Sequence, residues 1–248
     1  MRTFFNTFLL PVRVILGVVV TIIGASLGVL GGILDPNHRL GIYFGARWWA
    51  PAVLWVLGAK LKVFYRERVP MNTGQVYLCN HESLIDIPIA AYGAPHLLSF
   101  VGKQELRRVP FIGWAMMATD MIFIDRSNKE KAFESIHAAG LKIKNGKAVI
   151  LFPDGTRTRN GEVLPFKKGS FHLAINNDLD IIPMGIVGAY QVLPPDGLKI
   201  TPGRVALVFG HPISKEKYQG LTPEELSELV RTTILELREE GRKLWLNA

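Results

Sequence analysis

The apolar positions divide the chain into two parts. Residues 14–34 carry no charge, and a helix of this length, at about 1.5 Å per residue, reaches roughly the 30 Å thickness of a bilayer core. A second apolar stretch over residues 40–61 is interrupted by Arg47 and Lys60 and contains three tryptophans, which favour the water-lipid interface. The pattern predicts a membrane-associated pair of helices over residues 1–62.

A stripe of small residues supports the pairing of these helices. Gly24, Gly28 and Gly32 recur every four residues, so a neighbouring helix can approach closely, with the turn at 35–39 joining the two. Basic residues both precede and follow the first run, so the positive-inside rule gives no clear orientation. Embedding in one leaflet is favoured and a full span stays open, whereas a cleaved signal peptide is disfavoured because its apolar region is usually shorter.

From residue 63 onward, short apolar strands alternate with helical stretches. Capping-box signals at Ser127–Glu130 and Thr222–Glu225 predict the starts of two helices, the first running toward Lys144. This alternation predicts an α/β domain over residues 63–248, with a mixed, mainly parallel sheet flanked by helices. The expected strands are Gln75–Cys79, Leu97–Val101, Met121–Ile124, Ala148–Phe152, Ile181–Val187 and Val205–Phe209.

Composition narrows the class of protein. The 248 residues contain one cysteine, Cys79, so no internal disulfide can form and a cytosol-facing protein is the simplest reading. The net charge is +8, and residues 1–62 hold six Arg and Lys against one acid, Asp35. Because the basic excess lies in the most apolar segment, it favours an anionic lipid surface over nucleic acid as the partner.

The segment Asn80-His81-Glu82-Ser83-Leu84-Ile85-Asp86 follows a predicted strand and opens a helix. Either Ser83 caps this helix with Asp86 at its third position, or Asp86 caps it ahead of Pro88, and Pro88 favours the second option. In both cases Asp86 lies in the first turn, where helical side chains lean back toward His81. A histidine held by a carboxylate is a general base, although a capping Asp beside a solvated His explains this pattern equally well when it is taken alone.

Further sequence blocks follow in order along the chain. They are Lys103-Gln104-Glu105-Leu106, then Pro110 and Gly113, then Phe123-Ile124-Asp125-Arg126, Phe152-Pro153-Asp154-Gly155-Thr156-Arg157, and Ile182-Pro183-Met184. With this ordered set, residues 75–212 resemble the glycerolipid acyltransferase family, specifically 1-acyl-sn-glycerol-3-phosphate acyltransferases of the PlsC type. One departure is Asp154, where the family usually carries Glu.

The resemblance implies acyl transfer from acyl-CoA or acyl-carrier protein to the sn-2 hydroxyl of lysophosphatidic acid, giving phosphatidic acid. His81 with Asp86 is then the general base pair, and no covalent acyl-enzyme is needed. The acceptor phosphate needs positioning cations and backbone N–H groups. The predicted phosphate-binding residues are Arg157, Lys103, Arg126, Gly155 and Thr156, and the predicted acceptor-site residues are Asp154 and Glu105.

The sequence leaves two other functions open. An enzyme for another lysophospholipid or a lyso-aminolipid would keep His81 and Asp86 but need fewer cations, and a non-enzymatic membrane-binding protein would need neither. The other histidines show no metal-ligand spacing, so we predict no metal and no cofactor beyond the acyl donor. The expected location is the cell membrane, with the catalytic domain on the cytoplasmic side.

Overall fold

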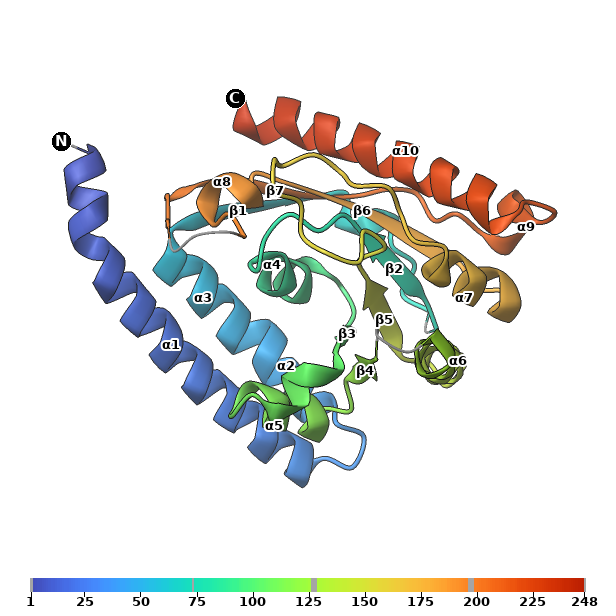
Figure 1. Cartoon of the computed structure of the whole chain (residues 1–248), viewed down its shortest axis with the longest axis horizontal. Coiled ribbons are helices and arrows are strands. Elements are labelled where there is room, and N and C mark those ends of the chain that lie inside the picture. The colour runs from blue at the N-terminus through green and yellow to red at the C-terminus, as the bar shows by residue number, and fades with distance from the viewer. Residues whose placement is uncertain (1, 73, 126–128, 196–198, 248) are drawn as a thin grey trace.

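The computed structural model describes residues 2–72, 74–125, 129–195 and 199–247. Its centre is a seven-stranded sheet in the order β1-β7-β6-β2-β5-β3-β4 (Figure 1). Every neighbouring pair is parallel except β6 with β7, so the mixed, mainly parallel sheet is confirmed. The strands are β1 (Ala59–Phe64), β2 (Val76–Cys79), β3 (Leu98–Lys103), β4 (Ile122–Ile124), β5 (Ala148–Leu151), β6 (Ile181–Val187) and β7 (Gly203–Phe209).

Strand β1 differs from the expected organisation. All six predicted strands are present within two residues of their expected ends, but residues 59–64 were expected to be divided between the helical anchor and the domain that follows. They form an edge strand that pairs in parallel with β7, so the sheet begins at Ala59 and not after Lys62. Its alternation of lysines with Leu61 and Val63 is typical of a strand. Because it directly continues an apolar helical stretch, the sequence pattern does not separate the strand from that helix. Gly58, with φ of 70°, ends the preceding helix and separates the two elements.

Helices cover both faces of the sheet. On one face, α3 and α4 pack against β2, β6 and β7, and on the other α6, α7 and α10 complete a second core (Figure 1). The side chains of β2 alternate between the two cores, as expected for a strand buried on both faces. The helices are α1 (Arg2–Leu34), α2 (Arg39–Phe44), α3 (Ala50–Leu57), α4 (Asp86–Gly93), α5 (Ile112–Ala118), α6 (Lys129–Lys144), α7 (Gly169–Asn177), α8 (Ala189–Val192), α9 (Lys215–Tyr218) and α10 (Pro223–Gly241), with short 3-10 or π turns η1 (Gly45–Trp49), η2 (Arg66–Arg68), η3 (Gln104–Arg108) and η4 (Arg242–Leu246).

The two predicted helix starts have different outcomes. Thr222 caps α10: its hydroxyl accepts the N–H of Glu225, whose carboxylate accepts the N–H of Thr222 at 2.8 Å, so this capping box is confirmed. Helix α6 begins at Lys129, and Ser127 of the other capping box lies outside the described residues.

Helix α1 lies along the outer side of α3, away from the sheet (Figure 1). Residues 9–34 and 39–57 are long and apolar enough to cross a membrane by length and composition. The small-residue stripe does bring helices close, because a Cβ on Gly24 would lie 2.6 Å from Trp49 and one on Gly32 would lie 2.0 Å from the carbonyl of Ala118. The stripe therefore packs against both α5 and the helical stretch over residues 39–57, although it was expected to pack against that stretch alone.

Candidate active site

The sequence blocks meet at one edge of the sheet. β2, β5, β3 and β4 run parallel, so the loops that follow them leave from the same carboxyl edge. His81 follows β2, residues 152–157 follow β5, and Lys103 ends β3. At about 4.8 Å between neighbouring strands, the end of β3 lies roughly 10 Å along this edge from the end of β2.

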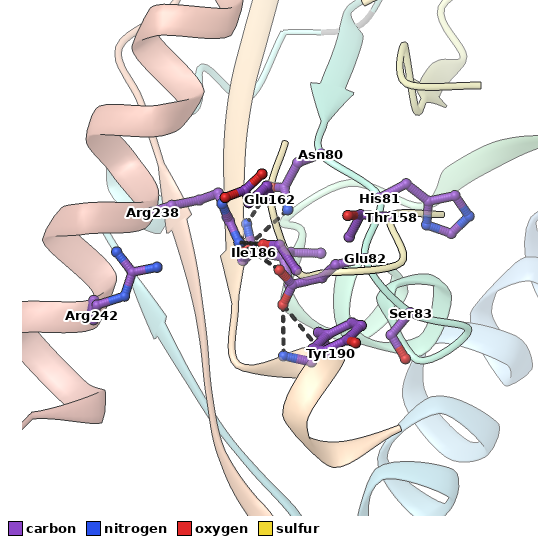
Figure 2. A network of polar contacts seen from close by, with 12 residues as sticks. Asn80, His81, Glu82, Ser83, Thr158, Glu162, Ile186, Tyr190, Arg238 and Arg242 are labelled. Carbon is purple, nitrogen blue, oxygen red and sulfur yellow. Dashed lines mark hydrogen bonds and ion pairs between the residues drawn. The ribbon is translucent and has the colours of Figure 1, made fainter. Parts of the chain in front are cut away.

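Asn80 fixes the chain where β2 ends. Its side-chain oxygen accepts the N–H of Ile186 at 2.8 Å, and its amide nitrogen donates to the carbonyl of Ile186 at 2.9 Å (Figure 2). This pair of bonds imitates a backbone pairing and extends the contact between β2 and β6 by one residue. The starting point of the His81 segment is therefore tied to the sheet.

Nδ1 of His81 lies 2.7 Å from Oδ2 of Asp86, in the contact expected from their spacing. The same carboxylate oxygen accepts the N–H groups of Glu82 at 2.7 Å and Ser83 at 2.8 Å, and the Asp86 side chain is fully buried. An ionised carboxylate only accepts hydrogen bonds, so Nδ1 must carry the proton and Nε2 keeps its lone pair. The arrangement fixes both the orientation and the tautomer of the ring.

The start of α4 differs from the favoured capping option. Asp86 is the first residue of the helix and does not cap it. The N-cap is Ile85, which makes no side-chain capping bond, so neither expected cap is present. The Asp86 carboxylate accepts the N–H of Ser83, and the Ser83 hydroxyl accepts the N–H of Ile85 at 3.3 Å. Pro88 is tolerated because it lies within the first turn, where its missing N–H is not required.

The rest of the His81 ring is open to a reactant. One face stacks on Phe152, with ring centroids 4.3 Å apart, and 17% of the side chain is exposed. Nε2 has no hydrogen-bond partner in the described part of the chain. A partly exposed imidazole with a free Nε2 and an anchored Nδ1 is able to accept a proton from a bound hydroxyl.

The loop after β5 is bonded directly to the His81 backbone. Asp154 accepts the N–H of His81 at 3.0 Å with one oxygen and the N–H of Leu164 at 3.1 Å with the other. The N–H of Thr158 donates to the carbonyl of His81 at 3.1 Å. Burial raises the pKa of Asp154 to about 7, against the lowering effect of these backbone bonds. Asp154 thus joins two backbone segments, and its carboxylate has no oxygen left without a donor.

Two cations of this loop have no acidic partner within the described ranges. Arg157 is half-buried, and its guanidinium forms no hydrogen bond or ion pair with any described residue. Gly155, with φ of 71°, allows the side chain of Lys167 to pass so closely that a Cβ would lie 2.7 Å from it. Unpaired cations at a strand end suit a phosphate. Lys167, which the sequence analysis did not include among the phosphate-binding residues, joins Arg157 as a candidate.

The other predicted residues lie further out. Lys103 and Glu105 are exposed, at the end of β3 and in η3, and Thr156 is exposed beside Arg157. The structure shows no hydrogen bond or ion pair between these three side chains and His81 within the described ranges. Arg126 lies outside the described residues.

Sequence reasoning missed a buried ion pair beside the histidine. Arg238 of α10 donates to Glu82 at 2.7 Å, and their side chains are 7% and 2% exposed (Figure 2). Burial raises the pKa of Glu82, and Arg238 opposes that rise. The available signal was an arginine among the apolar positions of α10, but 156 residues separate the partners.

A metal centre and a surface cavity are the two alternatives to a site at this edge. No group of three His, Cys, Asp or Glu side chains is placed to hold a metal ion within the described ranges. A surface cavity of about 390 Å³ is lined by η2, the loop after β7, α9 and α10, including Arg68, His211 and Glu240, and none of the residues predicted for the site lines it. The carboxyl edge therefore remains the candidate active site.

Comparisons with known proteins point in the same direction. The chain is 30% identical to the 1-acyl-sn-glycerol-3-phosphate acyltransferase of Cocos nucifera over 77% of its own length and 62% of that protein. It is 29% identical to the Saccharomyces cerevisiae protein of the same name, over 88% of this chain and 72% of that one. The crystal structure of the 1-acyl-sn-glycerophosphate (LPA) acyltransferase PlsC from Thermotoga maritima matches with a TM-score of 0.82 at 25% identity, covering 97% of both chains.

A match to a family model shows which family the chain belongs to, independently of single relatives. The acyltransferase family model matches residues 60–187, from β1 to the end of β6. This range exceeds half of the chain and contains all the sequence blocks at the carboxyl edge. The chain belongs to the acyltransferase family.

Proposed function

We propose that the protein transfers an acyl group from acyl-CoA or acyl-carrier protein to the sn-2 hydroxyl of 1-acyl-sn-glycerol 3-phosphate, giving phosphatidic acid. The observation that carries the proposal is the 2.7 Å contact between His81 and Asp86, beside a loop whose Arg157 has no acidic partner among the described residues. The named activities of the similar proteins support the same substrate class.

The proposed reaction proceeds in a ternary complex. Nε2 of His81 takes the proton of the acceptor hydroxyl, and the oxygen forms a bond to the thioester carbonyl carbon. The carbon-sulfur bond then breaks, and the imidazolium returns the proton to the leaving thiolate. Asp86 stabilises the imidazolium between these steps, and N–H donors near Gly155 stabilise the oxyanion.

The charges of the loop after β5 favour an acceptor that carries a phosphate. The half-buried Arg157 and the nearby Lys167 supply positive charge that no side chain in the described ranges neutralises. A phosphomonoester is the part of lysophosphatidate that such charges recognise. A neutral monoacylglycerol offers the same hydroxyl without this contact.

The assay compares three acceptors in detergent micelles: lysophosphatidate, lysophosphatidylcholine and monoacylglycerol, with thiol release from acyl-CoA as the readout. We expect lysophosphatidate to have the highest kcat/KM and Arg157→Ala to raise its KM without changing the KM for acyl-CoA. Arg242→Ala is the matched control, because Arg242 pairs with Glu239 on the far end of α10. Equal rates with all three acceptors would contradict the phosphate assignment, and no turnover with any of them would contradict the reaction.

We also propose that residues up to Gly58 form a membrane anchor lying in one leaflet, with the catalytic domain following from Ala59 and facing the cytoplasm, where acyl carriers are found. Gly28 and Gly32 of α1 pack against Ala115 and Ala118 of α5. A hairpin crossing the bilayer would carry α5 and the adjacent exposed cations of η3 into the hydrocarbon, which is costly. An anchor in the plane of one leaflet avoids that cost and holds the active site close to a lipid acceptor.

A further inference from the structure

Arg238 donates hydrogen bonds to three separate segments of the chain. Its Nε lies 2.9 Å from the carbonyl of Ile186, and one terminal nitrogen lies 2.7 Å from Oε2 of Glu82 and 2.8 Å from the carbonyl of Gly161 (Figure 2). A guanidinium is suited to this because its donors form a rigid, planar fork. One side chain of α10 thus joins β6, the His81 segment and the loop after β5.

Both residues next to His81 in sequence are connected to this guanidinium. Glu82 is bonded to it directly, and Asn80 shares the carbonyl of Ile186 with it. The other carboxylate oxygen of Glu82 accepts the N–H groups of Ala189 at 2.8 Å and Tyr190 at 3.2 Å. The backbone on either side of the histidine is therefore fixed to α8, β6 and α10.

The third bond reaches the loop that carries the candidate phosphate-binding residues. Gly161 lies four residues beyond Arg157, and the same loop is bonded to His81 through Asp154 and Thr158. A guanidinium bonded to both Glu82 and Gly161 holds the histidine segment and the loop at a fixed separation. Figure 2 shows the ring of His81 and the carboxylate of Glu82 pointing to opposite sides of the segment, so the ion pair does not face the reacting groups.

We propose that Arg238 and Glu82 are positioning residues, which set the distance between the general base His81 and the phosphate site at Arg157. This inference rests on the proposed function, because it assumes that His81 and Arg157 act on one acceptor molecule. A buried ion pair adds little stability compared with apolar residues of the same size, so stability alone does not explain a buried Arg238–Glu82 pair. The bonds of Arg238 to Glu82 and Gly161 instead join the two segments whose separation matters for acyl transfer.

The test uses variants that leave no buried charge unpaired. In Glu82→Gln/Arg238→Met, the amide oxygen of the substituted side chain still accepts the N–H groups of Ala189 and Tyr190, while the bonds to Gly161 and Ile186 are lost. Arg242→Met is the control, one turn further along the helical chain and paired with Glu239. Arg238→Lys keeps the charge without the fork, and we expect it to fall between the wild type and the double variant.

Two readouts distinguish positioning from a purely structural role. We expect kcat/KM for lysophosphatidate to fall by about 10²-fold in the double variant, because a small misplacement of reacting groups has effects of that order. The KM for lysophosphatidate should rise while the KM for acyl-CoA is unchanged, and the loss should shrink when Arg157→Ala is already present. A lower kcat with both KM values unchanged, or a full loss in the Arg157→Ala background, would overturn the proposal.

A readout without turnover separates this inference from the proposed function. Trypsin should cut the double variant faster after Arg157 and Arg159 than it cuts the wild type or Arg242→Met, because the loop has lost its bond from Arg238. Unchanged cleavage would overturn the positioning role even if acyl transfer is confirmed. Faster cleavage in a protein that transfers no acyl group would overturn the proposed function and restrict Arg238 to holding the loop.

Discussion

Asp86 reaches His81 by folding back over the turn that separates them, so that its Oδ2 lies 2.7 Å from Nδ1 of the ring. The same oxygen holds the N–H groups of Glu82 and Ser83, while Oδ1 is buried without a partner in the described ranges. The aspartate therefore stabilises both the shape of the turn and the orientation of the imidazole. Substitutions of Asp86 should affect both.

We expect Asp86→Asn to lower kcat by about 10²- to 10⁴-fold, because a neutral amide cannot stabilise the imidazolium. The new amide N–H₂ would also be buried without an acceptor, at a cost of about 1–3 kcal/mol in the free energy of unfolding. Steady-state kinetics and thermal unfolding measure the two effects. Asp178→Asn is the control, because Asp178 ends α7 in a left-handed conformation that asparagine adopts readily. A kcat close to that of the wild type would argue against the base pair.

The buried carboxylate of Asp154 should make stability depend on pH. Its pKa in the folded chain is raised from 3.8 to about 7, so the folded chain keeps a proton that the unfolded chain has lost between these values. Stability should therefore fall as pH rises through this window, and the urea midpoint should be lower at pH 8 than at pH 5. Asp154→Asn should reduce the slope without abolishing it, because the pKa of Glu82 is raised in the same direction. An unchanged slope would mean that Asp154 is ionised throughout.

Two glycines of α1 form a matched pair for testing its packing. A Cβ on Gly32 would lie 2.0 Å from the carbonyl of Ala118, whereas one on Gly17 would have nothing within 4 Å. We expect Gly32→Ala to lower the free energy of unfolding by about 1–3 kcal/mol through overpacking against α5. Gly17→Ala should be neutral or stabilising by up to about 1 kcal/mol, because alanine favours helix. Thermal unfolding in one detergent compares them, and equal shifts would show that α1 and α5 are not in contact.

The turn between the N-terminal helices reports how they lie in a membrane. Asn37 is exposed in this turn, and the native thiol of Cys79 is fully buried, so the wild type is a control for background labelling. In sealed vesicles, a membrane-impermeant maleimide should label Asn37→Cys from the same side as the catalytic domain. Labelling only from the opposite side would establish a crossing hairpin.

The site could be predicted where its contacts are local in the sequence. His81 and Asp86 are five residues apart, and the tendency of a first-turn side chain to lean backward was enough to predict their contact. Neither expected cap is present, because Pro88 is compatible with several positions in the first turn and the helix begins after Ile85, which makes no side-chain capping bond. The parallel strands also follow from alternation of apolar runs with helices.

Contacts between distant segments could not be predicted in this way. Arg238 and Glu82 pair across 156 residues. From the sequence alone, an arginine in an amphipathic helix is expected to be exposed to solvent. Strand β1 was missed because its period of two begins directly after an apolar helix. In both cases the structure is decided by a partner that is distant in sequence: Glu82 for Arg238, and β7 for β1.

The proposed role of His81 is that of the general base of acyl transfer. Its most direct test is thiol release from acyl-CoA with lysophosphatidate by His81→Ala, beside His211→Ala, which changes an exposed histidine outside the site. We expect His81→Ala to lose about 10²- to 10⁴-fold in kcat while remaining folded, and His211→Ala to keep the wild-type rate. Wild-type turnover by folded His81→Ala would contradict this role.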